Sequence, residues 1–144
     1  MLQAILIPFY ERDIRQLMEE LSLFEREEDL WKVRGSIKNA SGHLALHITG
    51  GLNYLVGTLL GHTGYVRNRD LEFSSPPVPR EQLIAGLEAL IPMIQRSLST
   101  LDMASDYPIP FDDAVRTNGY VLLQLALHLN YHLGQVNYLR RMLT

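Results

Sequence analysis

The chain has 144 residues, of which 47% are hydrophobic and 20% charged, so it can bury a core as a single domain over residues 1–144 and is unlike a disordered chain. Its formal net charge of −3 and the scatter of its Lys and Arg residues predict no nucleic-acid partner. Because the chain has no cysteine, disulfides, Cys-ligated metals and a Cys nucleophile are excluded.

The first two predicted elements are helices. Residues 2 to about 24 carry apolar side chains at spacings of three and four, opposed by a charged face, as in an amphipathic helix. A second helix is expected from about 41 to 60, where Asn39 and Ser41 are candidate N-caps. The Gly50–Gly51 pair is unexpected inside it, because each glycine costs about 1 kcal/mol relative to alanine. The pair indicates either close packing of another helix, which we favour, or room for a ligand.

Two more helices follow. The third begins at residue 79 or 80 and reaches about residue 101, and Pro92 is expected to kink it. The fourth extends from about 113 to 142, where Asp112 and Asp113 suit its electropositive N-terminal end. No stretch shows the alternation typical of strands. The sequence therefore predicts an all-α protein, and four long amphipathic segments indicate a four-helix bundle.

The linker between the second and third helices determines the predicted topology. Its roughly 18 residues, from about 61 to 78, exceed the about two to eight that commonly join neighbouring antiparallel helices. Fully extended they span about 55 Å, whereas a helix of about 20 residues is about 30 Å long. We therefore expect a long crossover between helices 2 and 3, which makes these helices parallel and gives an up–down–down–up bundle.

Histidines carry the strongest functional signal. His128 and His132 lie four residues apart on one face of the fourth helix, and His47 lies in the second helix. With the crossover, the depths of His47 and the pair differ by about 9 Å, against about 17 Å in a simple up–down–up–down order. Three His ligands leave an open coordination position, as in catalytic metal sites. The alternative is that each His is an ordinary core or rim residue.

His43 leaves a second arrangement open. It precedes His47 by four residues, so a closed four-His site is geometrically conceivable and would be structural. Because His43 follows a glycine at the expected start of the helix, close to solvent, we favour ligation without it.

Several polar side chains near the predicted ligands are candidates for hydrogen bonds that orient the imidazoles, or for substrate contacts. They are Gln135, Tyr131, Asn53, Arg67 and Arg69. For the first three, a polar rim on the bundle is an equally good interpretation. The two arginines lie in the linker and can bind a carboxylate or phosphate by forked hydrogen bonds, although we favour solvated loop charges or intersubunit salt bridges. No residue is assigned a catalytic role.

Three stretches are informative together: 42–50 (GHLALHITG), 61–69 and 128–135 (HLNYHLGQ). On these stretches the chain resembles the DinB/YfiT-like superfamily of small metal-dependent four-helix bundles, over nearly its whole length. The resemblance implies an up–down–down–up bundle, a nickel- or zinc-type divalent metal, and a homodimer. The family's three His ligands fall on His47, His128 and His132.

Characterised members of this superfamily include S-transferases and a maleylpyruvate isomerase that use bacillithiol or mycothiol. The resemblance and the open three-His site together predict a metal-dependent thiol S-transferase with a small-molecule substrate. The metal would hold the thiol as a thiolate, and a chain without cysteine fits a nucleophile supplied by a cosubstrate.

Two alternatives stay open. One is a non-catalytic metal-binding or stress-response protein. The other is a hydrolase that uses metal-activated water, which needs a general base; no Asp or Glu lies close to the three His in the sequence.

The expected location is cytoplasmic, with no membrane contact. The apolar N-terminal stretch lacks the basic start and the cleavage site of a signal peptide, and no apolar run reaches the length of a membrane span. The absence of disulfides is consistent with a reducing compartment.

Overall fold

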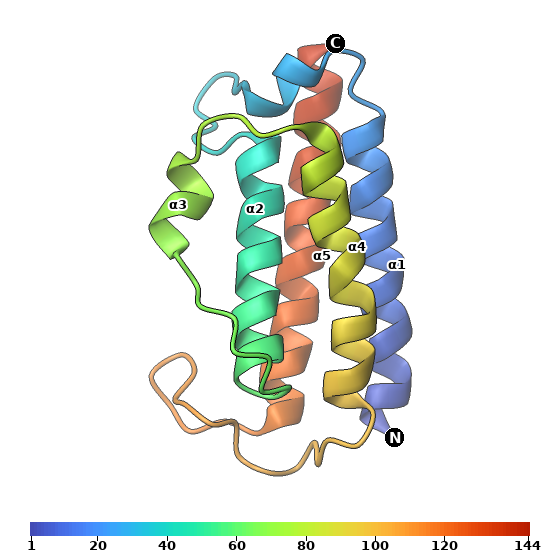
Figure 1. Cartoon of the computed structure of the whole chain (residues 1–144), viewed down its shortest axis with the longest axis vertical. Coiled ribbons are helices and arrows are strands. Elements are labelled where there is room, and N and C mark those ends of the chain that lie inside the picture. Colours follow the sequence, from blue (N-terminus) through green and yellow to red (C-terminus); the bar gives the residue numbers. More distant parts are fainter.

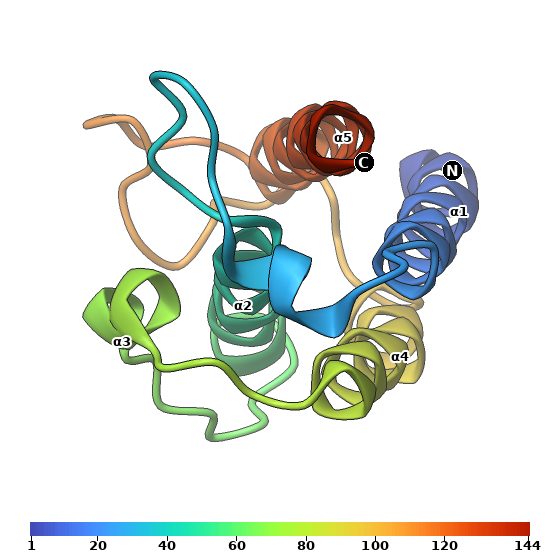
Figure 2. The same ribbon diagram turned by 90° about the horizontal axis from the view of Figure 1, so that it is seen from above.

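The computed structural model describes residues 1–144, and all of its regular structure is helical, which confirms the all-α prediction. Four long helices lie side by side in both views (Figures 1 and 2). They are α1 (Leu2–Ser22), α2 (Ser41–Leu52), α4 (Arg80–Leu98) and α5 (Asn118–Leu143). Three short segments join them: η1 (Glu27–Trp31), η2 (Asn53–Thr58) and α3 (Arg69–Ser74).

The direction of each long helix follows from the colours in Figure 1. α1 and α5 run upward in that view, whereas α2 and α4 run downward. The chain that leaves η2 therefore climbs back along α2 before α4 begins, and it carries α3 on the way. α3 packs on α2, so this linker lies against the long helix that bears His47.

The core consists mainly of the apolar stripes that the periodicity predicts. α1 packs against α4 and α5, and each of these helices contributes side chains with almost no exposed surface. Examples are Ile14 and Leu17 on α1, Leu87 and Leu90 on α4, and Leu122 on α5. Burying a side chain of this size contributes about 1.5–3 kcal/mol, so the stripes hold the long helices in a fixed relation.

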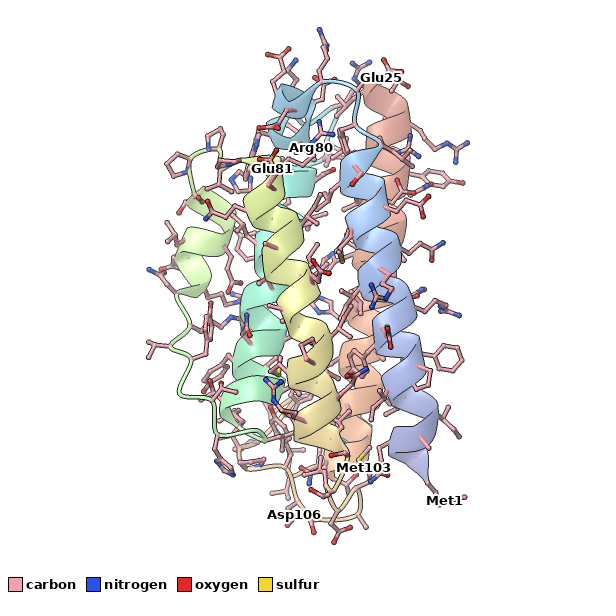
Figure 3. The ribbon with its side chains drawn as sticks, turned by 45° about the vertical axis from the view of Figure 1, so that its right-hand side comes forward. Met1, Glu25, Arg80, Glu81, Met103 and Asp106 are labelled. Carbon is pink, nitrogen blue, oxygen red and sulfur yellow. The ribbon has the colours of Figure 1, made fainter.

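Both ends of the molecule are tied by side chains. At the end that carries Glu25 and Arg80 in Figure 3, a guanidinium N–H of Arg80 donates to the Ser22 carbonyl at 3.2 Å, which joins the start of α4 to the end of α1. At the opposite end, near Met103 and Asp106, the Tyr107 hydroxyl donates to the Leu55 carbonyl. This bond anchors the segment 99–117 on η2.

The predicted bounds of two helices are wrong. α2 ends at Leu52 and continues as the π-helical turn η2 to Thr58, so the regular α-helix is shorter than expected. α5 begins at Asn118, where the Thr117 hydroxyl accepts from the Tyr120 N–H at 3.1 Å.

Asp112 and Asp113, which were expected at the start of α5, lie in a turn. Their φ values are +52° and +58°, in the left-handed region that a right-handed helix does not use. The backbones of Phe111 and Ala114 hydrogen-bond to each other across this turn. No helix combines the length and the apolar character needed to cross a membrane.

Candidate metal centre

The structure brings the three predicted ligands together. His47 comes from the middle of α2, and His128 and His132 come from successive turns of α5. One possible ligand atom from each residue lies within 4.8 Å of the others, and the Nε2 atoms of His128 and His132 are 2.7 Å apart. Such a cluster can hold a metal ion.

His47 is oriented by Glu72, a residue of α3 that the sequence did not single out. The Glu72 Oε1 atom lies 3.0 Å from Nδ1 of His47, and the carboxylate side chain is 6% exposed. An ionised carboxylate only accepts hydrogen bonds, so Nδ1 carries the proton and Nε2 keeps its lone pair. The side chain that bonds to this ring is therefore a carboxylate from the linker, and Asn53, the candidate nearest to His47 in the sequence, is not its partner.

Arg67 completes this arrangement. Its Nε atom donates to Glu72 Oε2 at 2.9 Å and its Nη2 atom donates to Oε1 at 3.0 Å, a forked pair. The guanidinium therefore balances the buried carboxylate beside His47. Arg67 is not the solvated loop charge that we favoured; its side chain is 15% exposed.

Gly50 and Gly51 of α2 leave the space that the side chains of Glu72 and Arg67 occupy. A Cβ atom added at Gly50 would lie 2.0 Å from Glu72 Oε2, and one at Gly51 would lie 3.3 Å from Arg67 Nη2. Glycine is thus required at position 50 for the carboxylate to reach His47. Glu72 belongs to α3, so close packing of another helix, the interpretation that we favoured, explains Gly50. Gly51 also lines the cavity beside the cluster.

His132 has its own orienting partner, Gln135, as the spacing of three residues suggests. The Gln135 Oε1 atom lies 2.6 Å from Nδ1 of His132, so this amide oxygen accepts a hydrogen bond from the Nδ1–H group. The Nε2 atom of His132 then carries the lone pair, and it faces Nε2 of His128. Two of the three imidazoles therefore have their tautomer set by a hydrogen bond on the far side of the ring.

The environment keeps the imidazoles neutral. Burial lowers the pKa of His47 and of His132, and burial together with the neighbouring His132 lowers the pKa of His128 to about 4. Neutral imidazole is the form that binds a metal ion. Three neutral nitrogen donors, two of them pre-oriented, fit a divalent transition metal well.

A cavity of about 200 Å³ adjoins the cluster and includes His47 and His128 in its wall. Arg67 and Arg69 also line it, and no Asp or Glu does. The rest of the wall is mainly apolar: Ile48, Leu52, Leu55, Phe111, Leu125 and Leu129. The site therefore has a mostly apolar chamber with a positive edge.

The remaining candidates lie outside this chamber. Tyr131 is 64% exposed, with its ring 5.5 Å from that of His132, and Asn53, the first residue of η2, does not line the cavity. The Nε2 atom of His43 lies 2.9 Å from the Ser75 carbonyl, and its ring meets Trp31 edge-on, so it does not join the cluster.

Glu72 is the functional residue that sequence reasoning missed. It follows His47 by 25 positions, inside a linker for which no helix was predicted. Two features of the sequence could have indicated it. Gly50 is unexplained beside the predicted ligand His47, and Arg67 and Glu72 carry opposite charges five residues apart in the linker. No protein-family model and no curated protein matches the sequence. Membership of the DinB/YfiT-like superfamily therefore stays a prediction.

Proposed function

We propose that this chain is a divalent-metal-dependent enzyme of the DinB/YfiT type that transfers a low-molecular-weight thiol to a small-molecule substrate. One observation carries the proposal: three neutral imidazoles converge from two helices beside a cavity. The ligands are His47, His128 and His132, and the ion is nickel or zinc, both of which suit imidazole donors.

The arrangement of the helices supports the family assignment. α1 and α5 run one way and α2 and α4 the other, and the linker that contains α3 joins two helices of the same direction. We infer an up–down–down–up four-helix bundle whose crossover covers α2. In this fold the crossover has a second role, because it supplies the Glu72 carboxylate that orients His47.

His47, His128 and His132 would hold a divalent cation, which when bound would keep an open position and would lower the pKa of a thiol there. The residues of the chain prepare this chemistry. His47 and His132 present Nε2 because Glu72 and Gln135 bind their Nδ1 atoms. The apolar wall of the cavity limits the water that competes with a thiol, and the chain, which has no cysteine, leaves the nucleophile to a cosubstrate.

Two observations favour thiol transfer over the alternatives. A hydrolase needs a free general base, but Glu72 is engaged by His47 and Arg67, and no acidic side chain lines the cavity. A closed structural site needs a fourth ligand, but His43 is held by Ser75 and lies outside the cluster.

We also propose that the protein is a homodimer that uses the outer face of α5. Leu127, Tyr131 and Tyr138 share this face by their helical spacing and are 59%, 64% and 67% exposed. Large apolar side chains grouped in this way are typical of protein–protein interfaces. Sedimentation equilibrium of the wild type and of Leu127→Asp tests this proposal; a monomeric wild type would refute it.

The proposed enzyme is tested first by metal content. Wild type and the variants His47→Ala, His128→Ala and His132→Ala are analysed by elemental mass spectrometry, with His43→Ala as the matched control. We expect one metal ion per chain in the wild type and the control, and a loss in each of the three variants. Retention of metal in all three, or no uptake by the wild type after reloading, would refute the site.

Loaded protein is then assayed for conjugation of thiols to electrophilic substrates. Turnover that disappears in His128→Ala supports the transferase. A thiol that binds wild type and His128→Ala equally well would leave a metal-binding protein without this activity.

A further inference from the structure

Arg69 is a cation in the wall of the cavity, and its guanidinium forms no hydrogen bond or salt bridge with the rest of the protein. It lines the cavity beside the His cluster, and its guanidinium lies 5.7 Å from the centroid of the Phe73 ring. That ring is in turn 4.8 Å from the ring of His47. Arg67, by contrast, is neutralised by its forked pair with Glu72. Of the two arginines in the wall, only Arg69 therefore has a charge that no carboxylate in the protein balances.

The shape and polarity of the cavity limit what this cation can bind. About 200 Å³ is smaller than most pockets that enclose drug-sized ligands, and six of the residues that line it are apolar. A single guanidinium presents two parallel N–H donors, which match the two oxygens of a carboxylate. A phosphate dianion would bring a second charge and a third oxygen into a wall that has no further free cation.

We propose that Arg69 is a specificity-determining residue that selects a small carboxylate-bearing molecule with an apolar body. The carboxylate pairs with Arg69, and the apolar part lies against residues such as Leu52, Phe111 and Leu125. This inference rests on the proposed function in one respect: it takes the cavity beside the three His as the substrate site. It adds the substrate class, which the metal site alone does not define.

The test uses zinc-loaded protein and a pair of probes that differ only in charge, 3-phenylpropanoate and 3-phenylpropanamide. Isothermal titration calorimetry gives Kd for both on the wild type, Arg69→Gln and Arg141→Gln. Arg141 is the matched control, because its guanidinium also lies over an aromatic ring, that of Tyr138, but outside the cavity.

We expect the wild type and Arg141→Gln to bind the acid about tenfold more tightly than the amide. This is a modest effect for a charge-assisted hydrogen bond, because Arg69 is exposed to solvent. In Arg69→Gln the two probes should bind equally. Equal binding by the wild type, binding of neither probe at millimolar concentration, or a preference that survives in Arg69→Gln would overturn the inference.

The same titration of His128→Ala separates this inference from the metal site. A preference for the acid that is lost in His128→Ala and kept in Arg69→Gln would mean that the carboxylate binds the metal, and the inference would be wrong. An Arg69-dependent preference in a wild type that takes up no metal would instead refute the proposed enzyme and leave the anion site in place. A phosphonate analogue that binds more tightly than the carboxylate would overturn the assigned class.

Discussion

Replacing Glu72 by alanine removes an acceptor that serves three N–H groups at once. Nδ1 of His47 lies 3.0 Å from this carboxylate, and the Nε and Nη2 atoms of Arg67 lie 2.9 and 3.0 Å from it. The variant leaves a guanidinium that is 15% exposed without its counter-charge. Removing one member of a buried ion pair costs about 3–5 kcal/mol, and we expect about 3 kcal/mol because Arg67 borders the cavity.

Metal affinity should fall as well. Loss of the hydrogen bond that orients a ligating imidazole typically weakens metal binding by about 10- to 100-fold, so we expect a decrease in this range for Glu72→Ala. Competition with a chromophoric chelator measures the affinity, and urea unfolding of the metal-free protein measures the free energy of unfolding.

Glu72→Gln separates the two effects. Its amide oxygen can still accept from Nδ1 of His47, but the charge that balances Arg67 is lost. We expect this variant to keep most of the metal affinity and to lose most of the stability that Glu72→Ala loses. Wild-type metal affinity in Glu72→Ala would show that the carboxylate does not orient His47, and unchanged unfolding in both variants would refute the role of the ion pair.

Three further predictions concern other parts of the structure. Gly50→Ala puts a methyl group 2.0 Å from Glu72 Oε2 and should lower metal affinity about tenfold in the chelator assay, whereas Gly134→Ala, which meets no atom within 4 Å, should keep it and stabilise α5 by up to about 1 kcal/mol. The metal-free protein should lose stability as the pH falls from 6.5 towards about 4. In this range His128 takes up a proton in the unfolded chain, whereas its lowered pKa keeps it neutral in the folded protein. Urea unfolding of His128→Gln should show a weaker pH dependence, and an identical one would contradict the lowered pKa. Thr117→Ala removes the N-cap of α5 and should cost about 1 kcal/mol; an unchanged urea midpoint would exclude the cap.

Long periodic stripes made most of the helices predictable. The apolar positions of α1 and α4 recur over many turns, so the structure places those helices within a few residues of their expected bounds. The start of α5 was not predictable in this way, because Asp112 and Asp113 look like first-turn acids in the sequence. Whether such residues begin a helix or occupy a left-handed turn depends on tertiary contacts such as the Tyr107–Leu55 hydrogen bond.

The candidate site likewise contains residues that local spacing makes predictable and one residue that depends on tertiary structure. His128, His132 and Gln135 are related by spacings of three and four on one helix, and local geometry alone places them together. Glu72 could not be found from spacing, because its position depends on how a linker of some 20 residues folds over α2. A helix of six residues is too short to leave a periodic signal.

The positions of the three candidate ligands along the chain affect how much a bound metal ion can stabilise the folded protein. His128 and His132 are local neighbours, whereas His47 precedes them by 81 positions (47 to 128) and meets them only after α2 docks on α5. An unfolded chain that retains a turn of helix around residue 130 can therefore still chelate an ion with two imidazoles. Binding to the unfolded state subtracts from the stabilisation that a ligand provides. Added metal will therefore raise the melting temperature by less than its affinity for the folded protein alone would give. The ratio of the affinities of the folded and the unfolded chain for the metal measures the contribution of His47.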